Sequence, residues 1–303
     1  MGGLVDISSG KVFLPPGRWM GVNIILVRYA EVGLKSPGVR RHFESILLDN
    51  MEAALARKRI EALINCEAGR IYVRTDRIDE AVDALVHVFG VASVSPAIEC
   101  GSGMEEMQSV AAEMSRSILD QGASFAVKAR REGSHPYTSM DVGREVGSAI
   151  FLANEDRGAK VDLTCPDVTI YVEVRGRRAF IFDRYIPGPG GLPLGSQGKV
   201  VASVHSERDA LAAWMLMKRG CKVLVWGDQH ADVLDAWDPR LKRLESSSLQ
   251  SAVRASKALG AVFGHRLEDI DLTCASDAGV PAFHPLVGMT EVELERRLEG
   301  IRR

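Results

Sequence analysis

A strand, a tight loop and a helix follow one another near residue 205, and this order of elements can hold a phosphate group. Residues 199–204 (KVVASV) form an apolar run typical of a buried strand, and an apolar helical pattern follows up to Gly220. The N–H groups at a helix N-terminus point at an anion, and glycines in the loop let the backbone approach it. The turn reads His205-Ser206-Glu207-Arg208-Asp209 and contains no glycine. The residues therefore leave open whether this frame accepts a nucleotide.

The side chains of this turn predict that it closes on itself. Ser206 and Asp209 have capping-box spacing, so the Ser206 hydroxyl is expected to accept from the Asp209 N–H and the Asp209 carboxylate from the Ser206 N–H. Such a cap contributes about 1 kcal/mol. Glu207 and Asp209 also place negative charge at the positive end of the helix dipole. The alternative, a new phosphate clamp made by His205 and Arg208, is less favoured because two carboxylates share the turn.

A second group of residues has the chemistry to bind a polyanion. Lys128 and Arg130 alternate onto one face of a predicted strand at 124–132, and Arg131 lies on the other face. Cations near phosphates give salt-sensitive binding that does not depend on sequence. The alternative is that these are ordinary solvated charges, which we favour for Arg177 and Arg178 at a hairpin tip. The candidate polyanion-binding residues are Lys35, Arg40, Arg41, Lys128, Arg130, Arg131, His135, Arg144 and Arg175.

Length and composition set limits on the protein that carries these residues. A chain of 303 residues, 46% apolar and 26% charged, is typical of a soluble protein with two or three domains. The net charge of −2 means that a nucleic-acid surface must be a local patch. Five scattered cysteines without a C-x-x-C pair indicate a reducing, cytoplasmic location and no metal site. No run reaches the roughly 18 to 20 apolar residues of a membrane span. Residues 1–20 lack a secretory signal and are expected to be a disordered leader, not translated if Met20 is the true start.

The elements that must position the candidate sites fall into three predicted units. The first has strands at 22–28, 69–75 and 91–99 and helices at 37–55 and 78–90, which matches a ferredoxin-like α+β fold. The second adds helices before and after strand 124–132, the later one with a Thr138–Asp141 capping box. The third follows a Pro/Gly hinge at 185–193 and contains a βαβ crossover, so a parallel sheet is expected. Trp214 and Met217 are expected to lie on the helix face packed on that sheet.

Several of these segments resemble one protein family. The opening ILVRYAEVGLKSPGVRRHF is similar to the R-Y-G-E-x-x-L-K signature and R-x-x-F helix of tRNA 4-thiouridine synthetases (ThiI-type proteins), with Ala30 in place of the glycine. Residues 125–182 resemble a THUMP domain, the RNA-binding module of that family. GPGGLPLGSQGKVV, MLMKRG and HPLVGMTEVELERRL resemble parts of its adenylating PP-loop domain.

The resemblance implies a fold, a domain division and a partner. The fold class is α/β and α+β, with an N-terminal ferredoxin-like domain at 21–99, a THUMP domain at 100–184 and a Rossmann-like PP-loop domain at 185–303. It also implies tRNA as partner and a homodimer. The family match favours the RNA reading for Lys128 and Arg130.

The resemblance fails at the loop that grips ATP in the active family, S-G-G-x-D-S. Counting back from MKRG sets Val204 against the first serine, and His205 and Ser206 against the glycines. Glu207 is at the variable position, and Arg208 and Asp209 are against the aspartate and last serine. The position of the internal relay cysteine reads Ser246-Ser247-Ser248, and no rhodanese domain precedes Arg303. Cys221 opens a predicted buried strand, and nothing around it or Cys274 suggests a reactive thiol.

These observations support three hypotheses. The first is a tRNA-binding protein that docks the acceptor stem, needs no cofactor, and leaves catalysis to another catalytic or sulfur-carrier protein. The second is an active tRNA sulfurtransferase with a divergent ATP site, in which ATP is the cofactor. The third is a role in thiamine-thiazole sulfur metabolism. Whether the chain is an enzyme depends on which of these holds.

Overall fold

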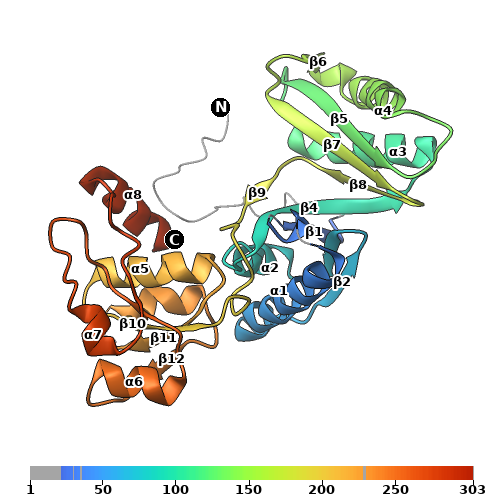
Figure 1. Cartoon of the computed structure of the whole chain (residues 1–303). Helices are drawn as coiled ribbons and strands as arrows, with labels where there is room; N and C mark the ends of the chain where they lie inside the picture. Colours follow the sequence, from blue (N-terminus) through green and yellow to red (C-terminus); the bar gives the residue numbers. More distant parts are fainter. Residues whose placement is uncertain (1–21, 30, 35, 228–229, 303) are drawn as a thin grey trace.

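The computed structural model describes residues 22–29, 31–34, 36–227 and 230–302, so the predicted leader lies outside the described residues. Figure 1 shows three units, with the first, in blue, between the second, in green, and the third, in orange to red. No described helix is long and apolar enough to cross a membrane.

The first unit has the strand order β2-β3-β1-β4, antiparallel throughout, as a ferredoxin-like fold requires. The strand β2 was not predicted from the sequence. Helix α1 begins at Pro37, where a missing N–H costs nothing. The elements are β1 (Ile24–Tyr29), η1 (Glu31–Leu34), α1 (Pro37–Arg57), β2 (Leu63–Glu67), β3 (Arg70–Arg74), α2 (Ile78–Leu85) and β4 (Val91–Gly101).

The second unit also follows the predicted order. Strand β5 is parallel to β7, and β7 is antiparallel to β8. The predicted capping box is confirmed, because Thr138 and Asp141 make both of its hydrogen bonds. The elements are α3 (Met104–Ile118), β5 (Ser124–Glu132), α4 (Ser139–Ala153), η2 (Glu155–Arg157), β6 (Lys160–Val161), β7 (Val168–Arg175) and β8 (Arg178–Phe182).

One long strand joins these two units. β4 pairs with β1 from Val91 to Ala97 and with β8 from Ile98 to Gly101. The sheets of both units are therefore continuous, in the order β2-β3-β1-β4-β8-β7-β5-β6 (Figure 1). The domain boundary expected between residues 99 and 100 falls inside this strand.

The segment predicted as a hinge is hydrogen-bonded to the first unit. Strand β9 (Ile186–Pro187) pairs with β4 at Ser93 and Val94. The Gly188 N–H donates to Ala92 O, and Gly190 exchanges hydrogen bonds with Val91 and Gly90. The chain thus reaches the third unit along a fixed path.

The third unit is a parallel sheet in the order β12-β11-β10-β13-β14. This is the doubly wound Rossmann order, so the predicted fold class is confirmed. Trp214 and Met217 lie in its core, as expected. The elements are β10 (Lys199–Ser203), α5 (Glu207–Lys218), β11 (Lys222–Trp226), η3 (Ala231–Ala236), β12 (Lys242–Leu244), α6 (Leu249–Ser256), β13 (Ala261–Val262), α7 (Cys274–Ala278), β14 (Ala282–Phe283) and α8 (Glu291–Ile301).

Candidate functional sites

The loop between β10 and α5 lies at the point where the strand order of the third unit reverses. β10 has β11 on one side and β13 on the other, and all three strands are parallel. Open α/β sheets bind ligands in the crevice outside the carboxyl ends of the strands at such a switch point. Residues 204–209 therefore occupy the position where a nucleotide would be expected.

The Asp209 carboxylate accepts three hydrogen bonds, from two loops at this switch point. Its Oδ2 atom accepts from the His205 N–H at 3.1 Å and the Ser206 hydroxyl at 2.8 Å. Its Oδ1 atom accepts from the Gly264 N–H at 2.8 Å, in the loop after β13. The carboxylate thus occupies donors that could otherwise face a bound anion.

One of the two hydrogen bonds predicted for the cap at Ser206 is present. The Ser206 hydroxyl accepts from the Asp209 N–H at 3.3 Å, as expected. The other differs, because the Asp209 carboxylate accepts from the backbone N–H of His205 and not from that of Ser206. The second carboxylate oxygen of Asp209 accepts from the Gly264 N–H in another loop. The local sequence pattern did not indicate this contact.

Gly264 shows how closely the two loops approach. A Cβ atom at this position would lie 2.6 Å from the Arg208 carbonyl carbon and from the Asp209 N atom. Only glycine fits there without moving the first turn of α5. The switch-point crevice is closed here by direct packing as well as by the carboxylate.

The other side chains of the loop also have internal partners. Val204 is fully buried. The His205 ring packs edge-on against Trp226, with centroids 5.4 Å apart. Arg208 Nη1 lies 2.8 Å from Asp269, and Glu207 accepts from Arg302 at 2.5 Å. A phosphate clamp made by His205 and Arg208 would have to break the Arg208–Asp269 ion pair.

Replacing Asp209 with alanine is expected to lower the free energy of unfolding by about 2 kcal/mol, because the buried Gly264 N–H and the helix cap lose their acceptor. Urea denaturation followed by circular dichroism measures the change. Glu207→Ala is a matched control, since it removes an exposed carboxylate of the same turn, and less than 1 kcal/mol is expected. Equal losses in the two variants would contradict the assigned role of Asp209.

Four of the five thiols offer little support for sulfur transfer, and the fifth, Cys165, is exposed. Burial raises the pKa of Cys66 to about 11 and that of Cys100 to about 12. Burial also raises the pKa of Cys221 and of Cys274. A thiolate is the form that carries sulfur, and these surroundings disfavour it. Ser248, in the expected position of the relay cysteine, caps α6 through the Ser251 N–H.

The structure divides the candidate cations of β5 between two faces of the sheet. Lys128 and Arg130 are exposed and point to the face without helices, in register with Tyr171 and Glu173 of β7. Arg131 points to the α4 face and donates to Gly133 O at 2.7 Å.

The remaining candidates lie around these strands or on α1. His135 Nε2 lies 2.7 Å from Gly176 O, and its ring stacks on Tyr137. Arg144 is exposed on α4 and pairs with Asp141 and Glu145. On α1, Arg41 is exposed and Arg40 donates to Gly33 O at 2.6 Å. Lys35 lies outside the described residues.

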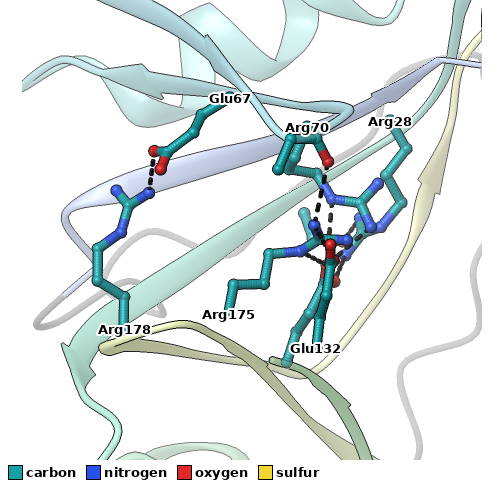
Figure 2. A network of polar contacts seen from close by, with 9 residues as sticks. Arg28, Glu67, Arg70, Glu132, Arg175 and Arg178 are labelled. Carbon is teal, nitrogen blue, oxygen red and sulfur yellow. Dashed lines mark hydrogen bonds and ion pairs between the residues drawn. The ribbon is translucent and has the colours of Figure 1, made fainter. Parts of the chain in front are cut away.

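Arg175 differs from the others because carboxylates surround it. It donates to Glu173 at 2.6 Å and to Glu132 at 2.5 Å, and its side chain is 17% exposed. Arg28 and Arg70 donate to the same Glu173, and Figure 2 shows these two guanidinium groups beside that of Arg175. Sequence reasoning missed this cluster. A single glutamate within the apolar strand VTIYVEVR was the available signal.

A groove that the sequence did not reveal opens on the α4 face of the second unit. Its volume is about 980 Å³, and β5, α4 and the segment after β6 line it with mostly apolar side chains. Gly143 and Gly147, one helical turn apart on α4, face Val127 of β5. This glycine spacing was the signal in the sequence. The lining includes Phe125, Val127, Met140, Arg144, Phe151 and Leu163.

Comparisons with known proteins agree with this architecture. The family model of the ThiI ferredoxin-like domain matches residues 24–95, and that of the THUMP domain matches residues 102–183. The chain belongs to the ThiI-type family. The resemblance drawn from the sequence is therefore confirmed.

Several curated relatives match about two thirds of this chain. A "Probable tRNA sulfurtransferase" of Methanosarcina acetivorans is 40% identical over 205 residues, which is 66% of this chain and 50% of that protein. One of Methanobrevibacter smithii is 41% identical over 211 residues, 68% of this chain and 53% of that protein. The chain thus spans about half the length of these relatives. The "tRNA sulfurtransferase" of Thermoplasma acidophilum is 28% identical over 332 residues, 91% of this chain and 67% of that protein.

Two solved structures share the whole arrangement. PH1313 of Pyrococcus horikoshii Ot3 superimposes with a TM-score of 0.80 at 29% identity, over 92% of this chain and 99% of that one. A 4-thiouridine synthetase solved with RNA and bound ATP gives 0.78 at 21% identity, over 92% of this chain and 85% of that one. At this identity the second match supports the ThiI-type fold alone.

Proposed function

We propose that this ThiI-type protein binds tRNA through its first two units and that its third unit no longer adenylates RNA. The observation that carries the proposal is the Asp209 carboxylate, bonded to His205, Ser206 and Gly264 at the switch point. A bound triphosphate would need those donors and would meet a fixed negative charge. Any catalysis then comes from a separate catalytic or sulfur-carrier protein.

The proposal takes tRNA as partner because curated relatives are called tRNA sulfurtransferases and a protein of the same fold was solved with RNA. Lys128 and Arg130 supply exposed cations on one face of β5. Folded RNA is recognised mostly through its shape and backbone, which such cations can contact. Binding is therefore expected to be strongly salt-dependent.

The groove beside α4 supports contact with unpaired bases as well. Phe151 and Met140, which are 38% and 84% exposed, line it with apolar surface, and Arg144 lies at its wall. Unstacked bases pack on aromatic and apolar side chains while cations hold the backbone. We infer that a single-stranded part of the tRNA lies in this groove.

Titration with Mg-ATP tests the central claim. No saturable binding is expected in calorimetry up to millimolar ATP, and no transfer of AMP to tRNA from α-labelled ATP. The Methanosarcina acetivorans relative serves as a comparison protein in the same assays. Saturable ATP binding or formation of adenylated tRNA would refute the proposal and favour an active sulfurtransferase.

Replacing Lys128 and Arg130 together with alanine is expected to weaken tRNA binding at least tenfold at low salt. The plot of log affinity against log salt should become shallower by about 2, because two phosphate contacts are lost. Gel-shift titrations between 50 and 200 mM salt measure both quantities. Lys242→Ala with Arg254→Ala is the control, as it removes the same charge from exposed positions of the third unit. If both double variants behave alike, β5 does not contact tRNA.

A further inference from the structure

The helix-free faces of the first two units meet around a small apolar core. Ile25 and Val27 of β1 pack with α1 and α2, whereas Ile24 and Leu26 point to the opposite face. In the second unit, Val172 packs with α3 and α4, and the neighbouring side chains point the other way. The shared core consists of Ile24, Leu26, Tyr72, Ala97, Phe180 and Phe182, all at most 1% exposed.

Glu173 lies at the edge of this core and receives hydrogen bonds from arginines of both units. Arg70 of β3 donates to Oε1 from Nε at 3.1 Å and from Nη2 at 2.7 Å. Arg28 of β1 donates to Oε2 at 3.0 Å, and Arg175 of β7 donates to Oε1 at 2.6 Å. Figure 2 shows these guanidinium groups converging from strands of different units.

These groups are largely withdrawn from solvent. The Glu173 side chain is 8% exposed, and those of Arg28, Arg70 and Arg175 are 12%, 15% and 17% exposed. The stability of ion pairs that are shielded from solvent in this way depends strongly on their geometry. Removing one partner leaves a buried charge without a counter-charge. Because the arginines already bind a carboxylate, they are poorly placed to contact an RNA phosphate.

Arg28 is held from several directions. It donates to Ser95 of β4 at 2.9 Å, and its guanidinium lies 5.0 Å from the ring centre of Phe182 and 4.4 Å from that of Tyr185. Its place relative to Glu173 is therefore fixed by β4 and by the segment after β8. Arg178, whose guanidinium lies 4.6 Å from the ring centre of Tyr72, pairs with Glu67 of β2 at 2.6 Å.

We propose that Glu173 is a positioning residue that fixes the angle between the first two units, so that the candidate cations of both units keep one fixed arrangement for tRNA. Its carboxylate joins three guanidinium groups that would repel one another without it. The exposed Glu132 offsets only the charge of Arg175. This inference rests on the proposed tRNA binding for its functional consequence, but the fixed angle can be measured without RNA.

The positioning role predicts a different effect on binding from the loss of a phosphate contact. A surface that must be ordered on binding has lower affinity, since association then includes the cost of ordering. The number of phosphates contacted in the complex stays the same. Glu173→Gln is therefore expected to weaken tRNA binding about tenfold with an unchanged salt slope, whereas removal of Lys128 and Arg130 flattens the slope.

Distances between spin labels test the angle directly. Cys165 of the second unit is exposed, and Glu52→Cys adds an exposed site on α1. The raised pKa of the four other thiols favours selective labelling. With labels at Cys165 and at the Glu52→Cys site, electron paramagnetic resonance should give one narrow distance distribution when Glu173 is present. The Glu173→Gln variant with the same two labels should give a broad or shifted distribution. Glu132→Gln, which removes the exposed partner of Arg175, should leave the distribution narrow.

Each result bears on a separate claim. An unchanged distribution in Glu173→Gln would overturn the positioning role, even if tRNA binding fell. If Glu173→Gln fails to fold, Arg70→Lys keeps the charge but cannot make the two-nitrogen contact, and its distribution decides the same question. A restored narrow distribution in Glu173→Asp would support the role of the carboxylate. If the parent chain itself binds no tRNA, the proposed function fails while the distance result still stands.

Discussion

Replacing Phe89 with alanine is expected to lower the free energy of unfolding by about 4 kcal/mol. Phe89 follows α2 in the first unit, yet its ring belongs to the core of the third unit and is 1% exposed. Its centroid lies 5.5 Å from that of Trp214, edge-on, and 5.4 Å from that of Trp237, stacked. Alanine would leave a cavity between two tryptophans and remove two aromatic contacts.

Urea denaturation followed by tryptophan fluorescence and by circular dichroism measures this loss. The fluorescence of the native Phe89→Ala protein should also change, because Trp214 and Trp237 lose a neighbour. Phe151→Ala is the control, since Phe151 is 38% exposed, and a loss of less than about 1.5 kcal/mol is expected. If the two probes give separate transitions, each is fitted separately. A loss below 1 kcal/mol for Phe89→Ala would show that the third unit does not depend on this contact.

Polar contacts beside Phe89 hold the same two units together. The Gly90 N–H donates to Gly190 O at 2.8 Å, and Asn50 of α1 donates to Leu194 O at 3.0 Å. Asn50 also accepts from Arg240 at 2.8 Å. The first unit is thus joined to both of its neighbours, to the third by Phe89 and to the second by β4.

Local patterns predicted those elements whose structure is determined locally. The 3.6-residue periodicity of α1 and the Thr138–Asp141 spacing of α4 describe contacts within one helix, and both are found. The βαβ order around residue 205 fixed the parallel sheet, since a crossover of this kind has one handedness. Val39 is an exception to that periodicity, because it is an apolar residue at helical spacing and yet is 42% exposed at the first turn of α1.

Features that depend on distant residues were not predictable in the same way. The strand β2 has alternating, half-exposed residues, and its backbone is paired with β3, which lies next to it in the sheet. Glu173 was not singled out from the sequence, because nothing local indicates that β1 and β3 supply its partners. The closure of the switch point was expected from Ser206 and Asp209, but the contact to Gly264 joins residues 55 positions apart.

The predicted RNA-binding set shows the same limit at the level of a site. Alternation along β5 correctly separated Lys128 and Arg130 from Arg131. Charge alone could not distinguish Arg130, which is exposed, from Arg175, whose guanidinium binds two carboxylates. The assignment of these residues to RNA stays a prediction, and Arg175 is the member least available for it.

Acid is expected to remove the stabilisation that Glu173 provides. Burial of the carboxyl group opposes ionisation, but Arg70, Arg175 and Arg28 outweigh it and hold the pKa of Glu173 at about 2, below the usual value of 4.5. The unfolded chain therefore takes up this proton at a higher pH than the folded chain. The contribution is complete above about pH 5 and is lost as the pH falls toward 2, and its size is about 3 kcal/mol.

The comparison of the parent chain with Glu173→Gln isolates this residue from other carboxylates. Hydrogen bonds also lower the pKa of Asp141, Asp162 and Asp167, so total stability falls in acid for several reasons. Urea denaturation at intervals from pH 6 to pH 2.5 should show the difference between the two proteins shrinking as the pH falls. Glu132→Gln should follow the parent chain throughout. A difference that stays constant over this range would mean that the pKa of Glu173 is the same in the folded and the unfolded chain, so that the three arginines do not stabilise its carboxylate.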